Sequence, residues 1–154
     1  MKIPKTLKHK PVIVSEEYDR IDGRYMGDSD AKGLSLGLAQ WNDRGKVDVS
    51  AKVWRYTGEK WSRQSEELPL HRVIDLAILI CRTKQYFESA IPAKQYEKNP
   101  TVDVITYGDG NMDISVCTDN PMISEDIRLF REAIANDPYL NERLQMLAVV
   151  LQNK

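Results

Sequence analysis

Residues 54–72 bring aromatic rings together with cationic and hydrogen-bonding side chains in one short stretch, WRYTGEKWSRQSEELPLHR. A tryptophan offers a rigid flat surface for stacking, and an arginine offers a planar fork of N–H donors to a phosphate or a carboxylate. This combination suits a planar, anionic ligand. We therefore predict a ligand-binding site composed of Trp54, Arg55, Trp61, Arg63, Gln64, His71 and Arg72.

The residue types indicate the roles within this predicted site. The tryptophans would stack on the ligand, the arginines and His71 would hold its phosphate, and Gln64 would read a base edge or a ribose hydroxyl. Arg55 shares the strand parity of the apolar residues before it, so we expect it to point to the buried side. An unpaired buried charge costs several kcal/mol, so Arg55 must meet either a ligand phosphate or an internal carboxylate such as Asp75 or Glu67.

Two acidic residues stand directly before a predicted helix. The helix dipole would stabilise Glu66 and Glu67 there by roughly 0.3–1 kcal/mol, which explains them without a catalytic role. In one alternative the protein is an enzyme, with Glu67 and His71 performing acid–base chemistry on a nucleotide-like substrate. In another it is a protein–protein interaction module, because tryptophan and arginine also dominate interfaces.

Other motifs argue against metal and nucleophile chemistry. Residues 28–33 imitate the start of an EF-hand loop, but Ala39 stands where that loop needs a bidentate glutamate. His9 and His71 are far apart in sequence, and neither has a zinc-ligand partner at a suitable spacing. The stretch Gly33-Leu34-Ser35-Leu36-Gly37 has the Gly-x-Ser-x-Gly pattern, but it lies within a predicted strand and not at the strand-to-helix turn that a nucleophile elbow requires. The chain has no glycine-rich phosphate loop. We expect no metal, no cofactor and no catalytic residue, and we favour non-catalytic binding of a small anionic, nucleotide-derived molecule.

Composition and charge describe one ordinary globular domain over residues 1–154. Hydrophobic residues make up 42% of the chain and charged residues 29%, and this length allows a sizeable core. The net charge of -1 gives no general attraction to a long nucleic acid or to an anionic membrane. The longest apolar run, residues 76–81, is far too short for a membrane span. We expect a cytoplasmic protein.

Alternating residues predict a β-hairpin around a turn at residues 42–45. A register in which Trp41 faces Lys46 puts the large apolar side chains of both strands on one face, which we expect to be buried. The predicted pairs are Leu38 with Val49, Leu36 with Ala51 and Leu34 with Val53. The opposite face carries small residues from Gly33 to Ala39 beside Trp54. Either another chain segment packs closely on that face, or it is a platform for a ligand.

The middle of the chain predicts a helix and a second hairpin. Apolar residues cover nearly every direction of a helix over residues 70–87, so we expect it to be the central buried helix. Asp109-Gly110 is a favoured sequence for a two-residue turn and would align Tyr107 with Met112.

The C-terminal third predicts two helices. Pro121 starts the first, and Asp137 caps the second ahead of Pro138. The second helix has an apolar seam formed by Leu140, Leu144, Leu147 and Leu151. The predicted fold class is α+β, an antiparallel sheet from two β-hairpins packed on a central apolar helix, with a C-terminal helical pair. The seam could instead serve a homodimer or a higher homo-oligomer.

Residues 18–83, YDRIDGRYMGDSDAKGLSLGLAQWNDRGKVDVSAKVWRYTGEKWSRQSEELPLHRVIDLAILICRT, resemble a small family of bacterial proteins. That family is common in Firmicutes and their phages and is catalogued as a domain of unknown function. The likeness continues loosely through CTDNPMISEDIRLF. The family has no established activity, so the resemblance implies no chemistry of its own. The phage distribution suggests, by analogy of lifestyle, sequestration of an immune signal such as a cyclic nucleotide or a cyclic ADP-ribose in the bacterial host cell, as a phage counter-defence.

Overall fold

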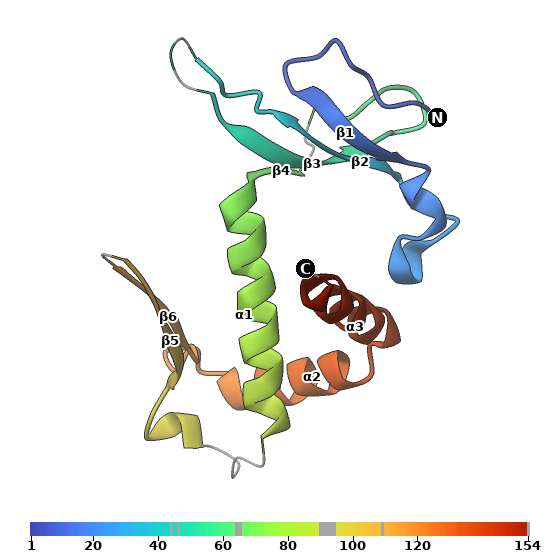
Figure 1. Cartoon of the computed structure of the whole chain (residues 1–154). Coiled ribbons are helices and arrows are strands. Elements are labelled where there is room, and N and C mark those ends of the chain that lie inside the picture. Colours follow the sequence, from blue (N-terminus) through green and yellow to red (C-terminus); the bar gives the residue numbers. More distant parts are fainter. Residues whose placement is uncertain (44, 46, 64–65, 90–94, 109, 154) are drawn as a thin grey trace. The chain divides into compact units, whose positions relative to one another are not determined.

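A computed structural model describes residues 1–43, 45, 47–63, 66–89, 95–108 and 110–153. Its elements are helices and antiparallel strands, so the fold class is α+β, as the sequence predicts (Figure 1). The chain forms two compact units, Met1–Asp75 and Leu76–Lys154.

The first unit is built on a four-stranded antiparallel sheet in the order β1-β2-β3-β4 (Figure 1). The strands are β1 (Lys10–Glu16), β2 (Ala31–Leu38), β3 (Val49–Arg55) and β4 (Glu66–Pro69). Two short 3-10 helices, η1 (Tyr18–Arg20) and η2 (Gly23–Tyr25), lie in the connection between β1 and β2. β4 runs directly into the helix α1 (Leu70–Glu88). The predicted ligand stretch therefore spans β3, β4 and the start of α1.

The hairpin of β2 and β3 has the predicted register. Leu38 pairs with Val49, Leu36 with Ala51 and Leu34 with Val53. A slip of one residue would exchange the two faces of a strand, so the alternation of large and small side chains was sufficient to define the pairing. Lys46, at the predicted turn, lies outside the described residues.

The prediction of which face of this hairpin is buried is wrong. Leu36 and Val49 are 42% and 40% exposed, whereas Ser35 and Ser50 on the opposite face are 4% and 0% exposed. The face of small residues is therefore the interior of this unit. It can be buried because small side chains allow another part of the chain to approach the sheet closely.

That other part is the N-terminal segment, so the packing alternative is confirmed. Ile3 and His9, which precede β1, are 3% and 0% exposed. A Cβ atom added to Gly33 would lie 2.4 Å from Cδ1 of Ile3, and one added to Gly37 would lie 2.0 Å from the carbonyl oxygen of Lys10. Larger residues at these two glycines would hold the N-terminal segment and β1 away from the sheet.

Two strands of this sheet are missing from the sequence prediction. β1 contains a continuous apolar run, Val12–Val14, in place of an alternation, and its pairing with β2 shifts between Pro11 and Ile13. β4 has only four residues and ends at Pro69. Both are edge strands, and edge strands are commonly short or irregular. Periodicity is a weak indicator for such strands.

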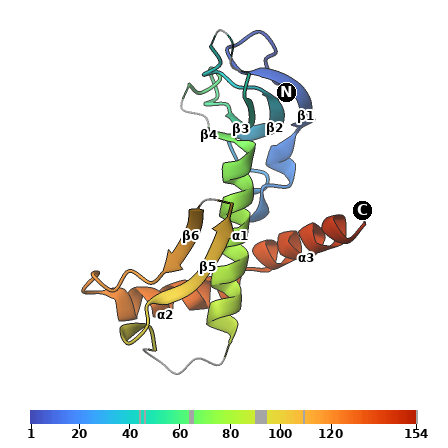
Figure 2. The same cartoon turned by 60° about the vertical axis from the view of Figure 1, so that its left-hand side comes forward.

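The second unit contains most of α1, two further helices and a two-stranded sheet (Figure 2). Its other elements are η3 (Gln95–Glu97), β5 (Thr101–Tyr107), β6 (Gly110–Ser115), α2 (Ile123–Ala135) and α3 (Pro138–Gln152). α2 runs beside the C-terminal part of α1, where the rings of Phe87 and Phe130 lie 5.8 Å apart. β5 and β6 form a sheet of their own and do not extend the first one.

The helix α1 has almost the predicted bounds, but the expectation that it is buried is wrong. None of its residues is buried, and Leu76 and Ile80 are 48% and 42% exposed. The apolar residues of α1 point in nearly every direction, and Phe87 near its C-terminal end contacts Phe130 of α2.

The second hairpin is present, but its predicted register is wrong by two residues. Tyr107 pairs with Gly110 and not with Met112. The turn therefore contains Gly108, whose φ of 44° is the left-handed conformation that a tight hairpin turn requires. The other turn residue, Asp109, lies outside the described residues.

The start of α3 agrees with the sequence prediction. The Asp137 side chain accepts hydrogen bonds from the backbone amides of Tyr139 and Leu140, both at 3.0 Å. Pro138 stands in the first turn, where its missing N–H is not needed. Asp137 therefore satisfies backbone donors that would otherwise lack a partner in the helix.

Candidate functional site

The two tryptophans of the predicted site lie against each other. Trp54 and Trp61 make a T-shaped contact with 5.9 Å between ring centroids, and Trp61 makes a similar contact with Tyr56 at 5.3 Å. Trp54 is only 1% exposed, and the Nζ atom of Lys52 lies 4.0 Å from the centroid of its ring. Trp54 therefore has no open face on which a ligand could stack, whereas Trp61 is half-buried.

Arg55 is held by carboxylates, as the ion-pair alternative predicts, but by different ones from those expected. Its guanidinium donates to Asp30 at 2.6 Å and to Glu66 at 2.5 Å. The hydrogen bonds to Glu66 and Asp30 raise the pKa of Arg55 above its ordinary value, in spite of partial burial. The predicted inward orientation is wrong, because Arg55 lies on the exposed face of the sheet and its side chain is 37% exposed.

The other described cations of the predicted site are exposed. Arg63 is exposed in the connection that leads to β4, and His71 and Arg72 are exposed in the first turn of α1. Gln64 lies outside the described residues.

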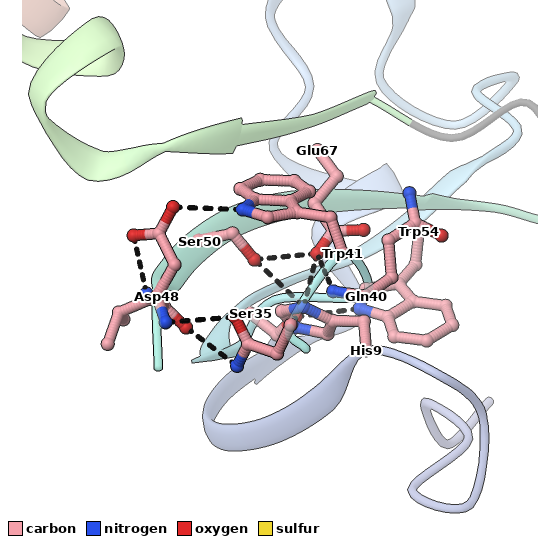
Figure 3. Close-up of polar contacts among 10 residues, drawn as sticks. His9, Ser35, Gln40, Trp41, Asp48, Ser50, Trp54 and Glu67 are labelled. Carbon is pink, nitrogen blue, oxygen red and sulfur yellow. Dashed lines mark hydrogen bonds and ion pairs between the residues drawn. The ribbon is translucent and has the colours of Figure 1, made fainter. Parts of the chain in front are cut away.

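A buried polar cluster, which the sequence analysis did not predict, lies beside Trp54 (Figure 3). We call His9, Ser35, Ser50, Trp54 and Glu67 the His9 cluster. The His9 ring lies 2.9 Å from Ser35 Oγ through Nε2 and 2.9 Å from Glu67 Oε1 through Nδ1. Ser50 Oγ donates to the same Glu67 oxygen at 2.6 Å, and Trp54 Nε1 donates to Ser35 Oγ at 2.8 Å. The cluster ties the N-terminal segment to β2, β3 and β4.

Two hydrogen bonds of the His9 cluster have a definite direction. Trp54 Nε1 can only donate, so Ser35 Oγ accepts from it, and the Glu67 oxygen accepts from Ser50 Oγ. Burial by itself would raise the pKa of Glu67, but hydrogen bonds from Ser50, a backbone amide and His9 hold that pKa below its ordinary value. Glu67 is therefore a carboxylate near neutral pH.

The order of contacts Glu67–His9–Ser35 is that of a catalytic triad, in which a carboxylate orients a histidine that activates a serine. Burial argues against catalysis. His9 is 0% exposed, Ser35 is 4% exposed and the Glu67 side chain is 1% exposed, so no substrate can approach the hydroxyl. We interpret the cluster as structural. The acid–base alternative also loses support, because the histidine that contacts Glu67 is His9 and not His71.

A pocket of about 590 Å³ lies in the second unit between the end of α1, η3 and α2. Cavities of this size commonly hold small molecules. The aromatic residues of its lining are Tyr86, Phe87 and Tyr96, the cationic ones are Lys84, Arg128 and Arg131, and the acidic ones are Glu88 and Glu132. Tyr96 is 7% exposed, and its hydroxyl lies 2.8 Å from Ser124 Oγ. Aromatic and cationic side chains, the two classes that the predicted ligand site combines, therefore line this pocket in a different part of the chain, with tyrosine and phenylalanine in place of tryptophan.

Two features of the sequence point to the residues of this pocket. Lys84, Tyr86 and Phe87 combine a cation with aromatic rings at the end of a helix, and Arg128 and Arg131 stand three residues apart on the next one. Residues three apart on a helix lie on the same side. What the sequence could not show is that the connection carrying Tyr96 returns to these two helices.

A protein-family model described as a family of unknown function (DUF6530) matches residues 1–154. The chain belongs to this family. No curated protein and no solved structure matches the chain. Membership of DUF6530 agrees with the predicted resemblance to an uncharacterised family and brings no chemistry with it.

Two further findings concern the described part of the chain. No group of three or more histidine, cysteine, aspartate or glutamate side chains is placed there to hold a metal ion. None of the helices in that part has both the length and the apolar character needed to cross a bilayer.

Proposed function

We propose that this DUF6530 protein binds a small, planar, anionic molecule of nucleotide-like character without converting it, and that it does so in the pocket of the second unit. The supporting observation is the lining of that pocket, in which three aromatic residues and three cations surround about 590 Å³. Aromatic side chains contact flat rings, and guanidinium groups bind phosphates or carboxylates. A nucleotide offers both kinds of group.

Arg131 connects the aromatic and anion-binding parts of the pocket. Its Nη2 donates to the carbonyl oxygen of Phe87 at 3.0 Å, and its guanidinium lies 5.7 Å from the centroid of the Phe87 ring. These contacts fix the guanidinium at the end of α1. A guanidinium has five N–H donors, so Arg131 keeps donors for an anion that enters the pocket.

Tyr96 and Ser124 supply uncharged hydrogen-bonding groups in the same lining. The two hydroxyls contact each other at 2.8 Å, and either one can be the donor. Each hydroxyl can both donate and accept, so the pair can exchange its mutual contact for contacts with a base edge or a ribose hydroxyl. A ligand with both a charged group and a polar ring would use Arg131 and this pair together.

Binding without turnover would make the protein a sequestering protein for its ligand, and the idea of a captured nucleotide-derived signal belongs to this proposal. The stretch over residues 54–72 gives it less support, since Trp54 is buried and Arg55 is occupied by two carboxylates. An enzymatic role for Glu67 gains no support either, because its side chain is 1% exposed.

The first test is mass spectrometry of the small molecules released by heating protein purified from a nucleotide-rich lysate. Calorimetry with the released compound then compares wild type with three variants. We expect Arg131→Ala to weaken binding about ten- to hundred-fold, the usual loss for a charge-assisted hydrogen bond of about 1.5–3 kcal/mol. Arg143→Ala, at an exposed arginine of α3, is the matched control.

The third variant, Arg63→Ala, distinguishes the two candidate places. Unchanged binding by Arg63→Ala together with weakened binding by Arg131→Ala supports the pocket of the second unit. The reverse result would move the site to residues 54–72. Release of a product in place of an intact ligand would contradict binding without turnover.

A further inference from the structure

Two of the three cations that line the pocket are already neutralised by carboxylates. Lys84 is ion-paired with Glu88. Arg128 donates twice to Glu125, at 3.1 and 2.7 Å, and contacts Glu132 at 3.5 Å. The hydrogen bonds to Glu125 raise the pKa of Arg128. These cations therefore have little charge left to offer to a ligand.

Arg131 is different. Its contacts with the Phe87 carbonyl and the Phe87 ring involve no formal negative charge. Within the described lining, it is the cation that no carboxylate neutralises. One anionic group of a ligand can therefore be matched in this pocket by one guanidinium.

We propose that the pocket selects ligands that carry a single negative charge, an inference that rests on the function proposed above. Glu88 is balanced by Lys84, but Glu125 and Glu132 share the single cation Arg128, so one of their two negative charges is not offset. A second negative charge on the ligand would meet this excess carboxylate, and Glu132 lines the pocket. Like charges brought together in this way are a common means of rejecting a wrong ligand. A ligand without charge would leave Arg131 unused.

This charge balance defines the chemical class of the ligand. A planar ring that bears one phosphodiester or one carboxylate has the required single charge. A terminal phosphate monoester carries between about 1.5 and 2 negative charges at neutral pH, and a triphosphate carries more. The structure therefore favours a cyclic mononucleotide, or an aromatic carboxylate with the same charge, over the corresponding linear nucleotides.

The experiment is calorimetry on the full chain with adenine and guanine compounds in four forms: nucleoside, 3′,5′-cyclic monophosphate, 5′-monophosphate and 5′-triphosphate. Nicotinate serves as a monoanion that is not a nucleotide. We expect the cyclic monophosphate of at least one base to bind about tenfold more tightly than its nucleoside and its triphosphate. Arg131→Ala should remove the advantage of the cyclic compound over the nucleoside. Circular dichroism of each variant confirms that it is folded.

A second variant tests the repulsive part of the inference separately. Glu132→Gln removes one of the lining carboxylates, so we expect it to bind the triphosphate more tightly than wild type does. The difference in affinity between the triphosphate and the cyclic monophosphate should therefore become smaller. A triphosphate that binds wild type as tightly as the cyclic compound would overturn the charge selection while leaving the proposed function in place. Binding of nicotinate alone would support selection for one charge and contradict the nucleotide-like ligand. Absence of binding by all compounds would contradict both.

Discussion

The hydroxyl of Ser35 makes two buried hydrogen-bond contacts. It accepts from the Trp54 indole at 2.8 Å and contacts His9 Nε2 at 2.9 Å, with all three residues buried. Ser35→Ala would leave the indole N–H and the imidazole nitrogen without partners. A buried polar group left unsatisfied costs about 1–3 kcal/mol, so we expect the free energy of unfolding to fall by at least that amount in urea titrations.

The matched control for this change is Ser15→Ala. Ser15 is an exposed serine of β1, and an exposed substitution of this kind usually changes stability by less than about 0.5 kcal/mol. Equal stability of Ser35→Ala and Ser15→Ala would show that the hydroxyl in the His9 cluster is not needed, and it would contradict the structural role given to the cluster.

The lowered pKa of Glu67 predicts how the free energy of unfolding changes at acidic pH. Its pKa in the folded protein lies below the ordinary value of 4.5, so the unfolded chain takes up a proton at a higher pH than the folded chain does. The stabilising contribution of this carboxylate is complete above pH 4.5 and is lost as the pH falls through the lower pKa of the folded state. Glu67→Gln cannot take up this proton. We therefore expect the stability of Glu67→Gln to depend less steeply on pH than that of wild type below pH 4.5.

The measurement is urea unfolding of wild type and Glu67→Gln at several values between pH 7 and pH 3. The pKa values of Asp19 and Glu125 are also lowered in the folded protein, but both residues are present in both proteins, so the difference between the two curves belongs to Glu67. Parallel curves would show that the pKa of Glu67 is the same in the folded and unfolded states.

At the scale of single residues, the sequence identified Trp54 and Arg55 as unusual, but not their roles. A tryptophan next to an arginine is compatible with a ligand site and with a packed interior. The choice depended on His9 and Asp30, which approach them from distant parts of the chain. The residue type sets which interactions are possible, whereas the neighbours from distant parts of the chain decide whether a side chain binds a ligand or packs in the interior.

At the scale of elements, prediction succeeded where the information was local. The register of β2 and β3 followed from their alternation, and the cap of α3 followed from Asp137-Pro138. The buried face of the hairpin could not be predicted from the hairpin itself, because the N-terminal segment decides which face is covered. Large apolar residues alone predict that their own face is the inner one, whereas the small residues of the opposite face indicate where another segment packs closely.

The glycines of β2 allow a test of this close approach. A Cβ at Gly37 would lie 2.0 Å from the carbonyl oxygen of Lys10 and 2.8 Å from Cα of Pro11. Both are backbone atoms, which cannot move aside without separating β1 from β2. We expect Gly37→Ala to destabilise the protein by about 1–3 kcal/mol, as overpacking commonly does, measured by urea unfolding.

Gly110 provides the control for this prediction. A Cβ at Gly110 would meet no atom within 4 Å, so Gly110→Ala should change stability far less. If the two alanine variants were equally stable, β1 would not approach Gly37 as closely as the structure shows.

The cap of α3 allows a separate prediction for the C-terminal helix. Asp137→Ala removes the acceptor of two backbone amides, at Tyr139 and Leu140. The loss of a helix N-cap usually costs about 0.5–2 kcal/mol. Hydrogen exchange should therefore become faster in the first turn of α3 and change little in β2 and β3. Uniform acceleration over the whole chain would show that the cap stabilises the protein globally and not this helix in particular.

At the scale of the whole molecule, the charge distribution is more informative than the total. A net charge of -1 excludes little beyond a general affinity for polyanions. The pairing of individual charges in the described lining of the pocket leaves Arg131 as the cation without a carboxylate partner. Composition could not give this result, because it depends on which lysine and which arginine the folded chain places next to a glutamate.

The salt dependence of ligand affinity tests whether Arg131 alone binds the anionic group of the ligand. One contact between an anionic ligand and Arg131, in a protein with little net charge, should weaken only a few-fold between about 0.1 M and 1 M salt, while the Debye length shortens from about 10 to about 3 Å. A ligand held by many phosphate contacts would lose several orders of magnitude in affinity. Calorimetry with a cyclic mononucleotide at both salt concentrations measures the difference. Arg131→Ala, which lacks the ionic contact, should bind weakly and with almost no salt dependence. A loss of a hundredfold or more in wild type would mean that several cations hold the ligand, and it would contradict the assignment of a single anion to a single guanidinium.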